Sequence, residues 1–554
     1  MAATGMHRRV EPRVDTLLRY LRTLQYLRPT QIVSRAWRGL HHPRPDLRAA
    51  PARRPVSQVF QAPVEGTPAL VAAEQFRFLN VEGLCAAASD WHPPGADKLW
   101  TYNLHYFDDL SARDADTRRT WHRRLLERWV AENPPAAGVA WEPFPVSRRI
   151  VNWVKWSLRG AELPAVCQTS LAVQARWLRS RLEYHLLGNH LLANAKALVH
   201  AGLYFSGPEA ERWYTHGMSI IERELHEQIL ADGGHFELSP MYHALVLEDL
   251  LDLVNLLRTY ARTPPADWFR VIAGMRRWLK VMTHPDGEIA FFNDAAFGVA
   301  PTSAALEGYA GRLDLDPVPD PGTTLVALEP SGYVRAVLGP ACLLCDCAAV
   351  GPDHLPAHAH ADTLSFELSL AGRRLFVNSG TSRYEWDPER QRQRGTAAHN
   401  TVGVDGQDSS EVWAAFRVAR RARAYLQAAR ATPHEVLIAG SHDGYRRLPG
   451  RIRHSRLWRL DEGSLRIEDR ISGAFRSATA RFHLHPDVAV RLVNGREVEL
   501  TRTDGALVRM IFEGASTVDV SPSHWYPEFG LAIANHCVVA HFAGSTLATR
   551  VVWA

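Results

Sequence analysis

The spacing of apolar residues changes once along this chain, near residue 320, and that change limits the folds that the chain can adopt. Before this point apolar residues recur every three or four positions, as at Trp121, Leu125 and Trp129, which places them on one face of a helix. After the turn residues 320–322 they recur at every second position, as in 333–338, which is typical of strands with one buried face. We therefore expect a helical part followed by an antiparallel β-part.

The helical part consists of amphipathic segments joined by short connections that contain Gly or Pro. Segment 17–27 has leucines on one face and arginines beside them, so it either packs on the protein itself or touches anionic lipid with its basic face. Residues 42–63 are rich in Pro and Arg, as in a linker or an extended surface arm. Further helices are expected at 121–129, 150–158, 171–186, 190–204, 213–230, 240–262 and 267–282. This series predicts antiparallel helical hairpins, stacked or closed into a ring.

The composition excludes several classes of protein. The formal charge of +5 is small for 554 residues, and the 64 basic residues, of which 60 are arginines, are spread along the whole chain rather than clustered as in a nucleic-acid-binding tail. The arginine content fits either an acidic ligand or a compositional bias. No apolar run approaches the ~18 residues that span a bilayer. Residues 1–35 lack the apolar core of a secretory signal.

The six cysteines do not form a disulfide framework. Cys342, Cys345 and Cys347 lie close together, but no second group completes a set of four metal ligands. Because they sit in the alternating apolar segment 341–350, we expect buried strand cysteines.

Three histidines in the β-part indicate an active site. His358 and His360 open a strand-like run that ends at Leu370, and in an extended segment alternate side chains point to the same side. His399 follows within residues 397–402. Imidazoles in such a group hold a metal, move protons or divide these tasks.

Two helix starts in the helical part contain polar residues that catalysis can use. Residues 188–194 place Asn and His where an apolar helix begins. Ser239 fits the N-cap and Pro240 the first position of the next helix, which puts Tyr242 in its first turn. The helix dipole there favours the tyrosinate form of Tyr242. Taken singly, these segments also fit capping, packing or an aromatic anchor.

Two further segments, 103–108 and 141–149, combine aromatic residues with Arg and Asn. This combination suits stacking on sugars and binding of acidic groups, although each segment alone also fits core or surface packing.

Together these segments resemble the heparinase II/III family of polysaccharide lyases. The resemblance covers most of the chain, and its most specific pieces are Gly188-Asn189-His190, Glu237-Leu238-Ser239-Pro240-Met241-Tyr242, His358-Ala359-His360-Ala361-Asp362, Asn378-Ser379-Gly380-Thr381 and Ala398-His399-Asn400-Thr401-Val402. It implies a multidomain α+β fold, an N-terminal (α/α) toroid followed by a C-terminal antiparallel β-sandwich, with the active site in the cleft between them. The expected division is a helical arm and linker over 1–90, a toroid catalytic domain over 91–320 and a heparinase II/III-like β-sandwich over 321–554.

The resemblance implies cleavage of a uronic-acid-containing polysaccharide by β-elimination, in which the C5 proton is removed and the C4 oxygen leaves. Asn189 with His190 or His358 would neutralise the carboxylate, and Tyr242 would be the base, the acid or both. His190 would be a second base for the opposite C5 epimer. The residues expected to contact the substrate are His105, Tyr106, Trp141, Arg148, Arg149, His243 and Asn400. A heparin-degrading enzyme would be secreted, and no secretory signal is expected here. A bacterial exo- or capsular polysaccharide is therefore the favoured substrate.

The resemblance also implies a metal site in the β-sandwich, with His360, Asn378 and His399 as ligands. The family usually has Asp where this chain has Asn378, and a neutral amide is a poorer Zn²⁺ ligand than a carboxylate. Two interpretations stay open: one divalent metal ion, Zn²⁺ or Ca²⁺, with a structural role, or a hydrogen-bonded cluster of the three residues that holds His358 in place.

Two other functions are compatible with the sequence. A non-lyase or glycan-binding component of surface-polysaccharide biosynthesis or export would suit a chain without a secretory signal. A glycoside hydrolase would need two paired carboxylates, for which Glu142 and Glu237 are candidates. An acidic polysaccharide is the expected partner, and a homodimer is compatible with the sequence. The location, cytoplasmic or at the cell envelope of a bacterium, stays open.

Overall fold

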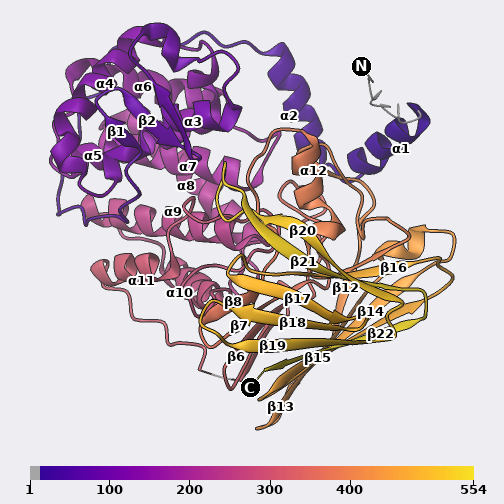
Figure 1. Ribbon diagram of the computed structural model, residues 1–554. Helices are drawn as coiled ribbons and strands as arrows, with labels where there is room; N and C mark the ends of the chain where they lie inside the picture. Colours follow the sequence, from indigo (N-terminus) through magenta and orange to yellow (C-terminus); the bar gives the residue numbers. More distant parts are fainter. Residues whose placement is uncertain (1–12, 323, 554) are drawn as a thin grey trace, which may run out of the picture.

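Helices fill the first part of the molecule and strands the second (Figure 1). The structure is a computed structural model and describes residues 13–322 and 324–553. It confirms the expected fold class, an (α/α) toroid followed by an antiparallel β-sandwich. The toroid helices are α3 (Lys98–Tyr106), α4 (Arg119–Glu132), α5 (Pro143–Leu158), α6 (Ala165–Ser180), α7 (Gly188–Tyr204), α8 (Pro208–Gln228), α9 (Pro240–Thr259), α10 (Ala266–Val281) and α11 (Ser303–Arg312). They are preceded by α1 (Arg13–Leu24) and α2 (Pro29–Leu40).

Local sequence sets the ends of these helices. Ser239 is the N-cap of α9 and accepts a hydrogen bond from the Tyr242 N–H at 3.2 Å, and Pro240 is the first helical residue, as predicted. The helix expected over 171–186 ends earlier, at Ser180, so Leu182 and Leu186 lie in the connection to α7. In that connection the N–H of Glu183 donates to the Asn194 side chain at 2.8 Å instead of continuing the helix.

A three-stranded sheet lies where a helical arm and linker were expected. Its strands are β1 (Leu70–Ala72), β2 (Gln75–Phe78) and β3 (Val81–Leu84). The sequence did not reveal them because strands of three or four residues are too short for an alternating pattern to stand out. The sheet is tied to α3 by Trp100, whose indole N–H donates to the Val81 carbonyl at 3.0 Å.

The β-part has two layers. One layer is an eight-stranded sheet, in the spatial order β12 (Ala424–Ala431), β13 (Glu435–His442), β14 (Arg453–Asp461), β15 (Ser464–Ser472), β22 (Thr546–Trp553), β19 (Leu507–Glu513), β18 (Glu497–Arg502) and β17 (Val488–Asn494). The second layer contains a five-stranded sheet of β4 (Leu325–Leu328), β5 (Tyr333–Leu338), β6 (Ala341–Asp346), β7 (Phe366–Leu370) and β8 (Arg373–Phe376). It is completed by a four-stranded sheet in the order β20 (Thr517–Trp525), β21 (Ile533–Phe542), β16 (Ala478–His483) and β9 (Val402–Val404).

Apolar side chains from both layers form one core between them, including Phe366, Trp458 and Phe482. The N–H of Val377 donates to the His483 carbonyl at 3.0 Å and joins the two sheets of the second layer. The six cysteines are free and buried, and Cys342 and Cys345 lie in β6, as expected from the apolar alternation around them.

The toroid and the sandwich share apolar contacts. Val377, Trp525 and Phe529 come from the sandwich and pack into the core of the toroid. The junction between the two parts is therefore a packed interface, and residues from both can be held in fixed positions there.

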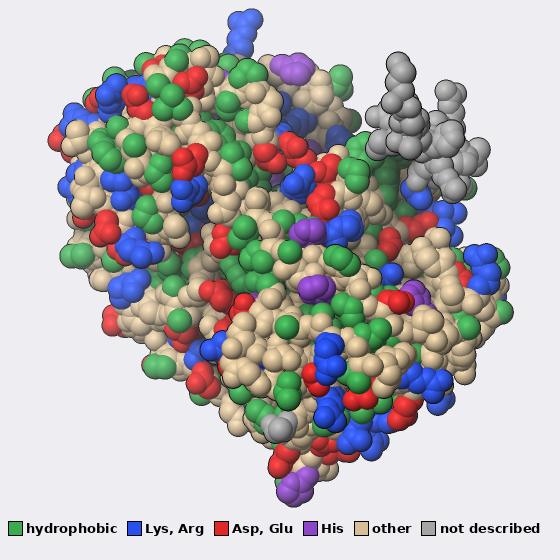
Figure 2. Space-filling view, viewed as in Figure 1, with side chains coloured by type: hydrophobic (Ala, Val, Ile, Leu, Met, Phe, Trp, Pro, Cys, Tyr) green, Lys and Arg blue, Asp and Glu red, His purple; other side chains and the backbone are tan. Residues whose placement is uncertain are grey.

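The surface carries charges of both signs. On the face seen in Figure 2, basic and acidic side chains are interspersed, in keeping with the small net charge. Within the described residues, none of the helices combines the length and the apolar character needed to cross a bilayer.

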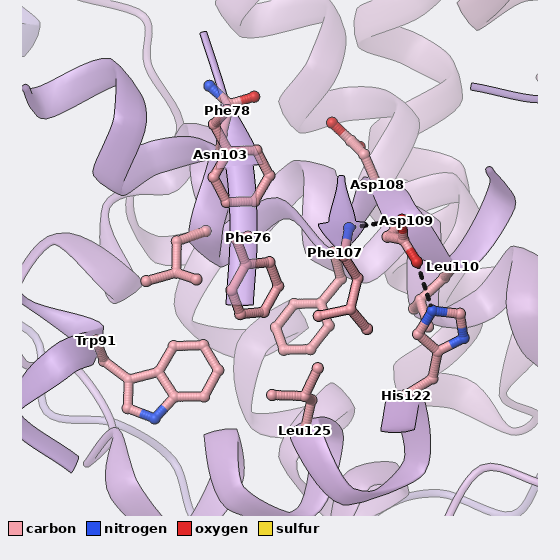
Figure 3. A pocket seen from close by; sticks show the side chains of 12 residues that line it. Phe76, Phe78, Trp91, Asn103, Phe107, Asp108, Asp109, Leu110, His122 and Leu125 are labelled. Carbon is pink, nitrogen blue, oxygen red and sulfur yellow. Dashed lines mark hydrogen bonds and ion pairs between the residues drawn. The ribbon is translucent and has the colours of Figure 1, made fainter. Parts of the chain in front are cut away.

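A buried carboxylate, Asp109, ties the small sheet to the toroid. Its oxygens accept hydrogen bonds from the Leu70 N–H at 3.0 Å and from Arg118 Nε at 2.9 Å, and His122 Nε2 lies 2.7 Å away. Figure 3 shows this carboxylate beside the His122 ring, at the edge of an apolar cavity that is also lined by Phe76 and Trp91. Burial raises the pKa of Asp109, but these hydrogen bonds outweigh burial and lower it to about 2.

We expect Asp109→Asn to lower the free energy of unfolding at pH 7 by about 2 kcal/mol, because the ionised carboxylate is stabilised by its partners in the folded state only. A depressed pKa contributes stability above pH ~4, and this contribution is lost as the pH falls towards 2. Urea unfolding followed by tryptophan fluorescence at pH 7 and pH 3 measures the difference. The exposed Asp116→Asn is the control, and an equal effect of Asp109→Asn at both pH values would contradict the assignment.

Candidate active site

The carboxylate of Asp294, in the loop that follows α10, holds the histidine-rich segment in place. Its Oδ2 lies 3.0 Å from His358 Nδ1, and its Oδ1 lies 2.9 Å from His360 Nε2. Arg390, in α12 (Pro388–Arg394), binds both oxygens and is fully buried, with Nη2 2.8 Å from Oδ2. Burial raises the pKa of Asp294, but Arg390 and the two histidines outweigh burial and hold it well below its ordinary value. An ionised carboxylate only accepts, so both imidazoles donate to it.

The segment with His358 and His360 is a loop and not the start of a strand. Residues 357–358 form a turn, and β7 begins only at Phe366. The expected extended geometry is therefore wrong. The two rings come together because both bind the same carboxylate, and not because of strand alternation.

Tyr242 lies against this loop. Its ring centroid is 3.8 Å from that of His358, with 27° between the ring planes. Its hydroxyl oxygen is 2.8 Å from the hydroxyl oxygen of Tyr384. Tyr242 comes from the first turn of α9, whereas His358 and Tyr384 come from the β-part. The candidate site therefore lies where the two parts of the molecule meet.

The protonation state of Tyr242 differs from the expectation. Burial raises its pKa, and the charges of Asp294 and Glu237 raise it further, against the opposing effects of Tyr384 and Arg390. Its hydroxyl is therefore protonated at neutral pH. The helix dipole, which favours the tyrosinate, is outweighed because dipole effects are worth at most ~2 kcal/mol.

Glu237 connects the start of α7 to the histidine loop. Its Oε1 accepts the Asn189 N–H at 3.4 Å, and its Oε2 lies 3.5 Å from His358 Nε2. Burial raises the pKa of this carboxyl. Gly188 suits this position because its φ of 56° lies in the left-handed region, and a Cβ would also lie 2.5 Å from Glu237 Oε1.

His190 forms an ion pair at the edge of the site. Its Nδ1 lies 3.2 Å from Glu183 Oε2, and its ring centroid is 4.6 Å from that of Phe144. Burial lowers the pKa of His190, but the charge and the hydrogen bond of Glu183 outweigh burial, so the pKa is raised. This favours a protonated imidazole beside Asn189.

Three residues around the site have a left-handed backbone. Leu187, Leu238 and Asn293 have φ angles of 67°, 58° and 58°, and each directly precedes a site segment. Such conformations cost of the order of 1–3 kcal/mol for residues other than Gly and cluster at active sites, although other described residues of this protein also have positive φ angles. The strain supports a functional role for the residues that follow.

A group of possible metal ligands lies behind His358. His360 Nδ1 and His399 Nε2 are 3.2 Å apart, and ligand atoms of His360, His399 and Asp362 all lie within 4.8 Å of one another. Asn378 is engaged elsewhere: its Nδ2 donates to the Phe291 carbonyl at 2.9 Å, and its Oδ1 accepts the Asn400 N–H at 3.2 Å. The structure therefore adds Asp362, whose carboxylate lies close to both histidines, as a candidate for the third ligand.

Two of the residues expected to contact the substrate lie beside the site. Tyr106 packs on Phe144, with 5.9 Å between the ring centroids, and so adjoins His190. The Arg148 side chain is 28% exposed and forms an ion pair of 2.9 Å with Asp108.

The others lie in the interior: His105, Trp141, Arg149, His243 and Asn400. Arg149 donates to the carbonyls of His105 and Ala140 at 3.1 and 2.9 Å, and His243 Nε2 lies 2.8 Å from the Met275 carbonyl. A polymer cannot reach these atoms in the folded protein. This corrects the expectation: these side chains hold the helices and loops around the site.

Sequence reasoning did not identify Asp294, Arg390 or Tyr384. Asn293 and Asp294 follow the apolar run 289–292, which is a weak signal for buried polar residues. Arg390 and Tyr384 lie in a stretch with many arginines and no apolar periodicity, so nothing distinguished them.

Comparisons with known proteins show what the chain as a whole is similar to. The family model "Heparinase II/III N-terminus" matches residues 17–310, and "Heparinase II/III-like, C-terminal" matches residues 320–554. FtsZ-localized protein C of Caulobacter vibrioides is 27% identical over 468 residues, 78% of this chain and 78% of its own. A heparin-sulfate lyase of Pedobacter heparinus is 26% identical over 334 residues, 53% of this chain and 49% of its own. This chain thus spans about half of that lyase. The crystal structure of heparinase III has the same fold, with a TM-score of 0.70 at 19% identity, covering 85% of this chain and 79% of that one.

We expect Asp294→Asn to destabilise the protein by about 3–5 kcal/mol, because it leaves the Arg390 guanidinium buried without a counter-charge. Adding Arg390→Met should recover part of this loss, giving a coupling energy of about 1–3 kcal/mol in a double-mutant cycle. Urea unfolding of the four proteins measures it. Strictly additive effects would show that the two side chains do not stabilise each other.

Proposed function

Because the chain belongs to the heparinase II/III family of polysaccharide lyases, we propose that it cleaves a uronic-acid-containing polysaccharide by β-elimination. The observation that carries this proposal is the stacking of Tyr242 on His358 at 3.8 Å, with Glu237 lying between His358 and the backbone of Asn189. Such a set supplies the groups that β-elimination requires: one that neutralises a carboxylate, one that accepts a proton and one that donates a proton.

The geometry supports a division of roles. Asn189 and the protonated His190 hydrogen-bond the uronate carboxylate, which makes the C5 proton more acidic. His358 donates through Nδ1 to Asp294, so its Nε2 is the nitrogen that accepts the C5 proton. The electron pair of the C5–H bond forms the C4–C5 double bond as the C4–O4 bond breaks. The leaving O4 takes the proton of Tyr242, whose raised pKa keeps that proton in place until then.

The charges around the site favour a polymer of low charge density. Cations in this region already have carboxylate partners: Arg148 pairs with Asp108 at 2.9 Å, and Lys98 pairs with Glu142 at 3.0 Å. Lys155 and Lys196 share Asp252 at 2.8 and 2.6 Å. A densely sulfated chain would meet cations that are already paired, while Lys155 and Lys196 are buried out of its reach, and both facts disfavour its binding. This supports an unsulfated exo- or capsular polysaccharide of a bacterium as the substrate.

We further propose that His360, His399 and Asp362 bind one divalent metal ion with a structural role. Burial lowers the pKa of His360 to about 4 and of His399 to about 3, which keeps both imidazoles in the neutral form that binds metals. The carboxylate of Asp294 on the far side of the His360 ring is the usual support of a metal-binding histidine. When bound, such an ion cross-links the loops that carry these ligands.

A second candidate function is glycan binding without cleavage, in the synthesis or export of a surface polysaccharide. The relative aligned over 78% of its own length, FtsZ-localized protein C, is named for its location with FtsZ and not as a lyase, so this alignment does not itself point to cleavage. A glycoside hydrolase is less well supported. Glu142 lies with Lys98 and Tyr102, and Glu237 lies with Asn189 and His358, so the two carboxyls belong to different clusters.

Purified protein should release unsaturated, ultraviolet-absorbing ends from an unsulfated uronate polysaccharide and not from a heavily sulfated one. Tyr242→Phe removes the proton for O4, and we expect it to lower kcat/KM at least about 100-fold. The control is Tyr425→Phe, which alters an exposed tyrosine of β12. Unchanged activity of Tyr242→Phe would contradict the mechanism. Binding of polysaccharides by the wild-type protein without any product would favour glycan binding without cleavage.

The ion pair of His190 predicts a pH dependence. A raised pKa keeps His190 protonated to higher pH, so kcat/KM should fall as the pH rises through this pKa. Glu183→Gln removes the charge that raises it, and the alkaline limb of the pH profile should move to lower pH. An unmoved limb would show that His190 does not act as a cation.

A further inference from the structure

Helix α2 packs on the protein with its polar side and exposes its apolar side. Gln31 is the one buried residue of the helix, and its amide donates to the His354 carbonyl at 3.2 Å. The exposed side chains are Ile32 (53%), Val33 (66%), Trp37 (62%) and Leu40 (82%). A surface helix normally buries its apolar stripe. The stripe of α2 is therefore turned away from the body of the molecule.

Helix α1 adds a second exposed apolar stripe. Its exposed apolar side chains include Leu17 (60%), Tyr20 (41%), Leu21 (55%) and Leu24 (47%). It is attached to the β-part through Tyr20, whose ring centroid is 4.8 Å from that of Trp413 in the hairpin of β10 (Val412–Trp413) and β11 (Arg417–Val418). Figure 1 shows α1 and α2 at the upper side of the view, outside the toroid and the sandwich. Of the two interpretations left open for segment 17–27, packing on the protein accounts for the contact of Tyr20 but leaves the leucines exposed.

Positive charge accompanies both stripes. Residues 13–44, from the start of α1, contain seven arginines and one acidic residue, Asp15. Neighbouring carboxylates offset part of this charge, since Arg28 lies 2.5 Å from Glu227 and Arg22 lies 3.9 Å from Glu411. Arg35 and Arg44 are exposed. The surface formed by α1, α2 and residues up to 44 is therefore apolar and basic at once.

This combination fits a lipid surface better than a folded partner. Exposed apolar stripes with arginines beside them are the signature of helices that lie in the plane of a bilayer interface. The amphipathic ring of Trp37 suits the level of the lipid headgroups. A bilayer accepts two separate helices without shape complementarity, whereas a folded partner would have to match both. The surplus of arginine selects anionic headgroups.

We propose that α1 and α2 form a membrane-binding surface that attaches this protein to bilayers containing anionic phospholipid. Gln31 bonds the loop that leads to His358, so the attachment holds the candidate site near the bilayer. The proposal does not depend on the proposed lyase activity.

Flotation of the full-length protein with lipid vesicles tests it. Wild-type protein should float with vesicles of phosphatidylcholine and phosphatidylglycerol, and far less with pure phosphatidylcholine or at high salt. The double variant Val33→Glu/Trp37→Glu should bind at least about tenfold more weakly, because it places charge in the apolar stripe. Arg35→Gln/Arg44→Gln should lower the affinity for the anionic vesicles roughly tenfold or more. Each arginine near an anionic surface contributes about fivefold to that affinity.

The control is Leu492→Glu/Val493→Glu, which alters two exposed apolar residues of β17 and should float like wild type. All substituted side chains are exposed, so thermal unfolding followed by circular dichroism should not change. The proposal is overturned if wild-type protein fails to float with anionic vesicles, or if Val33→Glu/Trp37→Glu floats equally well. It also fails if that variant instead converts a dimer into a monomer in light scattering, because the apolar surface of α1 and α2 would then bind a second copy of the chain.

Discussion

The arrangement of the candidate site depends on one buried charge, the carboxylate of Asp294. A carboxylate with no exposed surface is tolerated only when every oxygen is paired, and here Arg390, His358 and His360 supply the partners. Its backbone is fixed as well, because the Asp294 N–H donates to the His358 carbonyl at 2.9 Å and the Ser239 hydroxyl donates to the Asp294 carbonyl at 2.5 Å. These contacts allow only one arrangement of the start of α9, the loop after α10 and the histidine loop. In that arrangement the ring of Tyr242 stacks on the ring of His358.

The backbone stores strain at the same place. Leu187, Leu238 and Asn293 adopt left-handed φ angles immediately before Gly188, Ser239 and Asp294. These conformations persist because the packing around them fixes them, including the apolar contacts of Trp525 and Phe529 with the toroid core. The packing elsewhere in the molecule thus offsets the free-energy cost of the strained backbone at the site. A rigid scaffold of this kind holds the groups of the site in preorganised positions.

Local signals in the sequence predicted much of this structure. The Ser239-Pro240 pair gave the start of α9, and the change of period near residue 320 gave the order of the toroid and the sandwich. The buried pairing of Asp294 was not predictable in this way, because its partners lie 64 to 96 residues further along the chain. The same limit explains Arg149 and His243. Their residue types suggest a role in binding, and only the fold shows that their polar atoms face carbonyl groups inside the molecule.

We propose that the groups gathered around Asp294 break a glycan chain by elimination. The most direct measurement is mass spectrometry of the products formed from an unsulfated uronate polysaccharide in water enriched in heavy oxygen. Elimination predicts an unsaturated sugar at each new non-reducing end, no water added to the fragments and no heavy oxygen incorporated during cleavage. Fragments that gain one water, with heavy oxygen at the new end, would show hydrolysis and contradict the account.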